Sequence, residues 1–241
     1  MTEIAFSLIA FCTSLLTAVT GLGGGLILLG LMPGYVPAAA LIPVHAVVQL
    51  ASNSSRAVFG WQHICWQYMG AFLLGSVIGG LLASQVIRLL NLDYITLLIG
   101  VFILLSVWLP GWASRLLSGD NEMLAIGVLQ TGLGTAGANT GPLANASLMR
   151  LGCEHDEVVT TVAAQMSVTH LIKIFAFSAL GVSIWPFWPM MLGMSIGVVL
   201  GSWVGTRSRK KLDVMLAKKL IKGLLTLLAL RMIALTIIEL L

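Results

Sequence analysis

The chain alternates between long apolar stretches and short polar connections. No Asp, Glu, Lys or Arg occurs from Ile4 to Ser55, from Ala57 to Ile87 or from Ile174 to Thr206. A helix that spans a bilayer needs about 20 mainly apolar residues, whereas the strands of a transmembrane barrel alternate polar and apolar positions. The pattern therefore predicts an all-α polytopic membrane protein. We place its membrane segments at 4–34, 36–59, 66–89, 92–109, 122–150, 157–179, 185–206 and 214–238.

Glycine interrupts the first and fifth of these segments, which are too long for one plain helix. The clusters are Gly21–Gly25 and Gly132–Pro142. Glycine is unfavourable in a helix interior, and non-helical backbone at membrane depth survives only inside protein or along a water-filled cavity. A break at matching positions of two halves is the best sequence pointer to the binding site of a transporter.

Two short sequences recur at similar offsets. Thr20-Gly21-Leu22-Gly23 returns as Thr131-Gly132-Leu133-Gly134, an offset of 111, and Ser76-Val77-Ile78-Gly79 resembles Met194-Ser195-Ile196-Gly197, an offset of 118. We predict two tandem repeats of about four membrane segments, each with a glycine-broken first helix: 1–110, an inter-repeat loop at 111–121, and 122–241. If each broken segment crosses once, the halves run parallel about an axis along the membrane normal. Re-entrant hairpins would change that count.

Charge is scarce and clustered. The 241 residues include 13 Lys or Arg and 9 Asp or Glu, which is 9% charged against about 25% in soluble domains. These charges cannot cover the surface of a soluble protein. The net charge of +4 comes largely from the stretch between Arg207 and Lys222, beside apolar segments. Basic residues in such a place indicate the cytoplasmic side of the membrane, and we expect no nucleic-acid partner. The loop 207–211 is expected in the cytoplasm. Counting single crossings places Arg150 and Arg88 on that side and both termini outside.

Arg56 and Lys173 are cations within apolar segments, and they lie 117 positions apart, at nearly equivalent places in the two halves. Polar residues share a helical face with each of them. The segment interiors hold no Asp or Glu, which favours an anionic substrate. Helices that restart near Gly25 and Pro142 would point free backbone N–H groups, which favour an anion, at the same binding site. The predicted substrate-binding residues are Gly23, Gly24, Gly25, Gln49, Ser52, Asn53, Arg56, Gly137, Asn139, Thr140, Gln165, Thr169, His170 and Lys173.

Structural interpretations of these features stay open. The glycines are also suited to close helix packing, Arg56 to snorkelling toward an interface, and Lys173 to pairing with a backbone carbonyl. His45, one turn from Gln49, is interpreted as structural. We expect no catalytic residue, metal site or cofactor. Cys12, Cys65 and Cys153 lack metal-ligand spacing, and an intramembrane enzyme is disfavoured because the sequence has neither His-Glu-x-x-His nor a pair of intramembrane aspartates.

The glycine motifs resemble those of the TauE/SafE family, also called the 4-toluenesulfonate uptake permease family. The matching stretches are Gly21–Gly25, Gly132–Gly137, 44–59 and 66–76. The resemblance implies a two-repeat fold and transport of sulfite, organosulfonates or sulfoacetate across the bacterial inner membrane. The more polar second break (139–142) and the sequence at 63–66 depart from the pattern.

The function predicted from these features is a secondary transporter that moves a small anion by alternating access. Its expected partners are the anionic substrate and the lipid bilayer, with coupling to protons or another ion and a homo-oligomer left open. The alternatives are a passive anion channel and a Met/Cys metal-ion transporter.

Overall fold

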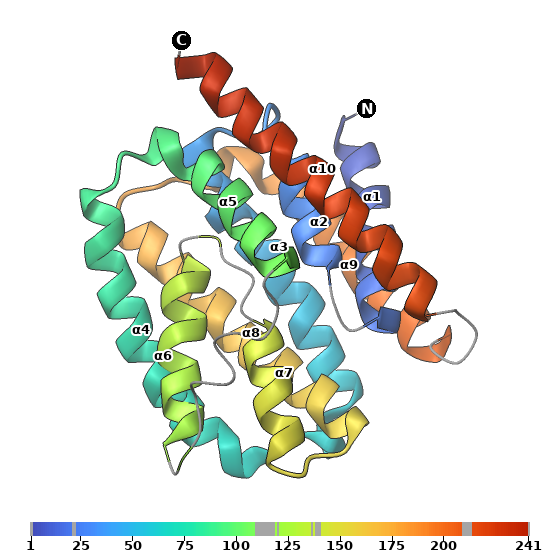
Figure 1. Ribbon diagram of the computed structural model, residues 1–241. Coiled ribbons are helices and arrows are strands. Elements are labelled where there is room, and N and C mark those ends of the chain that lie inside the picture. The colour runs from blue at the N-terminus through green and yellow to red at the C-terminus, as the bar shows by residue number, and fades with distance from the viewer. Residues whose placement is uncertain are drawn as a thin grey trace.

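The computed structural model describes residues 2–20, 23–108, 119, 121–135, 137, 141–208 and 214–240. These residues form a bundle of helices (Figure 1). The helices of the first half are α1 (Thr2–Thr20), α2 (Gly24–Leu31), α3 (Ala38–Phe59), α4 (Met69–Leu89) and α5 (Ile95–Trp108). Those of the second half are α6 (Glu122–Thr135), α7 (Gly141–Arg150), α8 (His155–Ala179), α9 (Trp188–Ser208) and α10 (Val214–Leu240). Short 3₁₀ helices lie at Trp61–His63, Trp66–Tyr68, Leu92–Tyr94 and Trp185–Phe187.

Five described segments are long and apolar enough to cross a membrane: Thr2–Thr20, Trp66–Leu89, His155–Ala179, Trp185–Arg207 and Lys219–Ile238. Large apolar side chains such as Leu81 and Leu82 point outward from the bundle, as a lipid-facing surface requires. The all-helical membrane class is therefore confirmed. Eight spans were predicted, and the three without a counterpart are α5, which is short, α3, whose polar side chains lower its hydropathy, and the second glycine-rich segment, which forms the two shorter helices α6 and α7.

The glycine-rich segments fold back instead of crossing once. Helix α2 runs antiparallel to α1, because Gly24 packs against Thr13 and the ring of Tyr35, after α2, lies 5.1 Å from that of Phe6 near the start of α1. Helices α6 and α7 form the equivalent pair, because Arg150 at the end of α7 forms an ion pair with Glu122 at the start of α6. These contacts overturn the assumption of single crossings.

Corresponding helices of the two halves run in opposite directions. Helices α3 and α8 are antiparallel, since Ser54 Oγ donates to Ser167 Oγ (3.2 Å) while Gly60 lies beside Thr160. Helices α5 and α10 are also antiparallel, since Trp108 Nε1 donates to Thr226 Oγ1 (3.2 Å) while Gly100 lies beside Ile233. The prediction of parallel halves is wrong because each folded-back segment adds one reversal, so each half makes an odd number of passes and the second half starts inverted.

The antiparallel arrangement also places Arg88 at a different end of the bundle from the one predicted. Helices α4 and α6 run parallel, with Gly75 beside Leu124 and Gly79 beside Val128. Arg88, in the last turn of α4, therefore lies at the end opposite Arg150, and not on the same side as predicted. The two chain termini lie at one end of the bundle (Figure 1).

Glycine stripes bring the halves into close contact. Along α9, Gly193, Gly197 and Gly201 recur every four residues, and a Cβ on any of them would collide with Ser7 or Phe11 of α1. Small residues allow this backbone approach, which is the usual interface of membrane helices. The Gly-x-Ser-x-Gly sequence at 193–197 is part of this helical stripe and not the strand-to-helix turn that a hydrolase nucleophile occupies.

Candidate functional site

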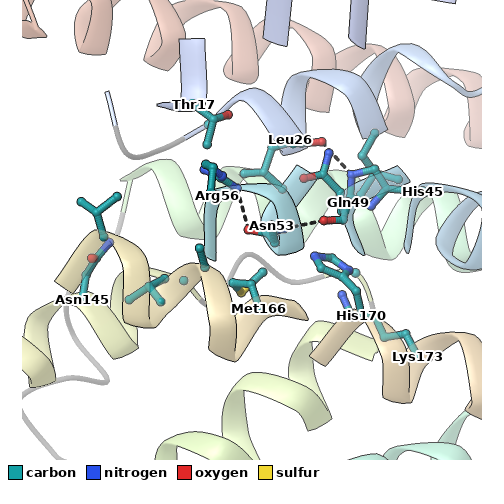
Figure 2. A pocket seen from close by; sticks show the side chains of 18 of the residues that line it. Thr17, Leu26, His45, Gln49, Asn53, Arg56, Asn145, Met166, His170 and Lys173 are labelled. Carbon is teal, nitrogen blue, oxygen red and sulfur yellow. Dashed lines mark hydrogen bonds between the residues drawn. The ribbon is translucent and has the colours of Figure 1, made fainter. Parts of the chain in front are cut away.

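A cavity of about 100 Å³ lies in the interior of the bundle, where both halves contribute to its wall. A water needs about 10–15 Å³ of such volume, so the cavity is large enough for a small polyatomic ion. Figure 2 shows α3 and α8 with their polar side chains turned toward it. The lining residues are Thr17, Gly23, Gly25, Leu26, Leu29, Ile42, His45, Gln49, Asn53, Arg56, Gly137, Gly141, Asn145, Val159, Val162, Ala163, Met166, His170 and Lys173.

The cavity brings together most of the predicted binding residues that the structure describes. Those in its lining are Gly23, Gly25, Gln49, Asn53, Arg56, Gly137, His170 and Lys173. Those outside the lining are Gly24, Ser52, Gln165 and Thr169. Asn139 and Thr140 lie outside the described residues.

The predicted residues outside the lining make other contacts. Ser52 Oγ is within 3.0 Å of Ser14 Oγ, and the Ser14 hydroxyl also lies 2.8 Å from that of Ser202, so these serines join α3 to α1 and α9. Thr169 Oγ1 is 3.1 Å from Thr131 Oγ1 on α6. A polar stripe on a helix is wide enough for its edges to face neighbouring helices while its centre faces the cavity.

Arg56 is held against its own helix by polar neighbours. Its NH2 group donates to Asn53 Oδ1 (2.5 Å) and its Nε to the carbonyl of Ser52 (3.3 Å), while Asn53 Nδ2 donates to the carbonyl of Gln49 (2.8 Å). The guanidinium is half-buried. This chain of hydrogen bonds fixes a cation on the cavity wall, as a binding site for an anion requires.

Two histidines meet where α3 crosses α8. His45 Nε2 donates to the carbonyl of Gly25 (2.9 Å), which ties α3 to the first turn of α2. Its ring centroid is 6.0 Å from that of His170. Within the described part of the chain, the Nδ1 atom of the buried His170 has no hydrogen-bond partner. A buried polar atom without a partner is costly, so this nitrogen is available to a bound molecule.

Lys173 gives the cavity a second cation. Its side chain is 5% exposed, one helical turn beyond His170 on α8. Because α3 and α8 are antiparallel, Arg56 and Lys173 lie toward opposite ends of the cavity (Figure 2). The lining residues in the described ranges include no Asp or Glu. The cavity therefore has the electrostatics of an anion site.

The starts of two helices border the same space. Gly23 and Gly25 flank the start of α2, and Gly141 is the first residue of α7. Gly23 has φ 89°, a left-handed conformation that glycine adopts at little cost. Both starts present N–H groups and the positive end of a helix dipole. The predicted binding residues did not include two lining residues, Thr17 and Asn145. Asn145 is an amide side chain in the first turn after the second glycine cluster, and this position in the sequence could have identified it.

A family model described as "Sulfite exporter TauE/SafE" matches residues 6–232, which is nearly the whole chain. The chain belongs to the TauE/SafE family. This membership confirms the resemblance seen in the glycine motifs, and it identifies a multi-pass membrane protein of a transporter family. Comparison of this TauE/SafE chain with curated proteins and with solved structures gave no match.

Proposed function

We propose that the protein is a secondary transporter that moves a small sulfur-containing anion, sulfite or an organosulfonate, across the bacterial inner membrane. The observation that carries this proposal is the cavity between α3 and α8, with Arg56 from one half, Lys173 from the other and no carboxylate among its described lining residues. Membership of the TauE/SafE family supports the class of substrate.

The anion would bind between the two cations. Sulfite and sulfonate oxygens accept several hydrogen bonds, and charge-assisted donors such as Lys and Arg are the strongest partners for them. Gln49 and Asn53 orient the anion from α3, and His170 does so from α8 through its Nδ1 atom. The N–H groups at the starts of α2 and α7 complete the cradle. Asn139 and Thr140, outside the described residues, stay predicted ligands from the sequence.

Alternating access would follow from an inverted relation between the halves. We infer that 1–110 and 122–241 are inverted repeats, each with a glycine-broken first helix, which rock about the shared cavity. Arg56 is half-buried and Lys173 is buried. We infer that the described conformation opens toward the end that carries Arg150, which is the end nearer Arg56, and that the two cations exchange their exposure in the opposite state.

The orientation in the membrane follows from the basic residues. We expect the loop 207–211 in the cytoplasm, because cytoplasmic loops carry the excess of Lys and Arg. Arg207, in the last turn of α9, lies at the same end of the bundle as Arg150. Both termini are then outside. In this orientation the described conformation opens inward.

Transport in proteoliposomes tests the proposal. The purified protein is reconstituted, and uptake of radiolabelled sulfite, sulfoacetate and sulfate is measured with and without a pH gradient. We expect saturable uptake of at least one sulfur anion and acceleration by the same anion inside the vesicles. Conductance without this acceleration would identify a channel, and the absence of saturable flux under every condition would refute the transporter.

A further inference from the structure

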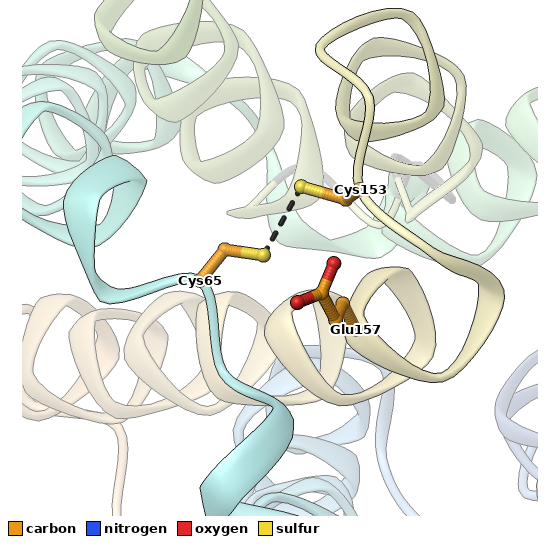
Figure 3. A group of neighbouring side chains, drawn as sticks. All are labelled: Cys65, Cys153 and Glu157. Atoms are coloured by element: carbon orange, nitrogen blue, oxygen red, sulfur yellow. Dashed lines mark hydrogen bonds between the residues drawn. The ribbon is translucent and has the colours of Figure 1, made fainter.

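Two cysteines and a glutamate meet at one end of the bundle, and none of the three belongs to the cavity lining. Cys65 belongs to the connection between α3 and α4, Cys153 to the connection between α7 and α8, and Glu157 to the first turn of α8 (Figure 3). The Sγ atoms of the cysteines are 3.1 Å apart, and both lie within 4.8 Å of a Glu157 carboxylate oxygen. All three side chains are half-buried. One ligand comes from the first half of the chain and two from the second.

Hydrogen bonds position each of the three residues. The backbone N–H of Cys65 donates to Thr161 Oγ1 (2.9 Å), and that of Cys153 donates to the carbonyl of Leu148 (3.0 Å). Glu157 Oε2 accepts the backbone N–H of Glu154 (2.8 Å) as part of a capping box at the start of α8. A carboxylate fixed in this way keeps its other oxygen for a ligand, and such outer hydrogen bonds are typical of metal sites.

We propose that Cys65, Cys153 and Glu157 form a site for a soft divalent transition-metal ion of the zinc class, one that joins the two halves. Thiolate ligands select zinc-like ions over Mg²⁺ or Ca²⁺, which prefer oxygen. Zinc–sulfur bonds of about 2.3 Å in a tetrahedron separate two sulfurs by about 3.8 Å, so the cysteines need to part by less than about 1 Å. Three protein ligands leave a fourth position for water.

The surroundings favour a metal over a disulfide. A bound cation stabilises a thiolate and releases its proton, so a metal holds both sulfurs without oxidising them. The cluster lies at the end of the bundle that carries Arg150, which the proposed orientation places in the reducing cytoplasm, where paired cysteines more often bind metal.

Cobalt and cadmium binding to the full chain in detergent tests the site. With a non-thiol reductant present, both ions are titrated and the near-ultraviolet charge-transfer band of thiolate–metal bonds is recorded. We expect one ion per chain, competition by Zn²⁺ and release of protons. Cys65→Ser and Cys153→Ser should each abolish the band, and Glu157→Gln should weaken binding at least about tenfold. Cys12→Ser and Glu3→Gln, a thiol and an exposed carboxylate of α1, are the matched controls and should bind as the native chain does.

Four outcomes would overturn the site. The first two are a native chain that shows no charge-transfer band and a band that survives both Cys65→Ser and Cys153→Ser. The third is a Cys12→Ser variant that loses the band as fully as they do. The fourth is native protein in which Cys65 and Cys153 are joined in a disulfide even with the reductant present. Size-exclusion profiles of each variant separate loss of the site from loss of the fold. The binding readout is independent of anion transport, so this proposal and the proposed function fail separately.

Discussion

Replacing Lys173 by methionine removes the buried cation of the cavity while keeping most of its stem. The side chain is 5% exposed, and the described lining residues offer it no carboxylate. A charge buried in this way is costly without a partner, so its removal should leave the thermal unfolding midpoint unchanged or raised. If the proposed substrate is that partner, transport should fall. The variant is thus expected to separate function from stability.

The size of the effect follows from the contact that is lost. A hydrogen bond to a charged group contributes about 1.5–3 kcal/mol, and each 1.4 kcal/mol is roughly a factor of ten in affinity. Lys173→Met should therefore lower the ratio of maximal uptake rate to KM by about 10–150-fold. Uptake of radiolabelled sulfite or sulfoacetate into proteoliposomes measures this ratio, and a fluorescence-detected thermal melt in detergent measures the midpoint.

A matched control removes the same charge elsewhere. Lys222 is exposed and its Nζ lies 3.9 Å from the centroid of the Trp108 ring, outside the cavity. Lys222→Met should transport normally. Native transport by Lys173→Met would refute the assignment of the site even if the protein is a transporter. A large fall in the melting midpoint together with lost transport would show that Lys173 has a structural partner instead.

Substitutions at three further positions probe the site and its scaffold. Arg56→Lys keeps the charge but loses the donor fork that Asn53 orients, so it should raise the KM for the anion several-fold, and Arg56→Gln should raise it further; concentration-dependent uptake distinguishes them. Gly25→Ala would place a Cβ 2.9 Å from Gln49 Oε1 and should lower uptake, whereas Gly70→Ala, with open space around it, should not. Glu122→Gln removes the buried partner of an ion pair and should cost about 1–3 kcal/mol, which a lower thermal midpoint reports, with the KM unchanged.

The membrane class and the charge of the site could be predicted from the sequence. Long stretches without charge require a lipid environment, and a helical period of 3.6 places Gln49, Asn53 and Arg56 on one face whatever the neighbours are. The equivalent reasoning selected His170 and Lys173. Because no acid occurs in the interior of these segments, a positive cavity followed from composition and spacing alone.

Which polar residues face the cavity was decided by the tertiary contacts. Periodicity defines the face of a helix but not what packs on each edge of it, so Ser52 and Thr169 were predicted as ligands although they bind other helices. His45 was interpreted as structural. Its bond to the Gly25 carbonyl brings it into the cavity wall because α2 folds back beside α3.

The direction of the chain is the part that the sequence alone could not determine. An apolar stretch broken by glycine is equally compatible with one crossing and with a hairpin, because both bury the same side chains. Only the contacts of Phe6 with Tyr35 and of Glu122 with Arg150 distinguish them. Local hydropathy thus determines that the chain enters the membrane and which side chains are polar there. The packing of α1 on α2, and of α6 on α7, decides that the halves are inverted and that Arg56 and Lys173 lie toward opposite ends of one cavity.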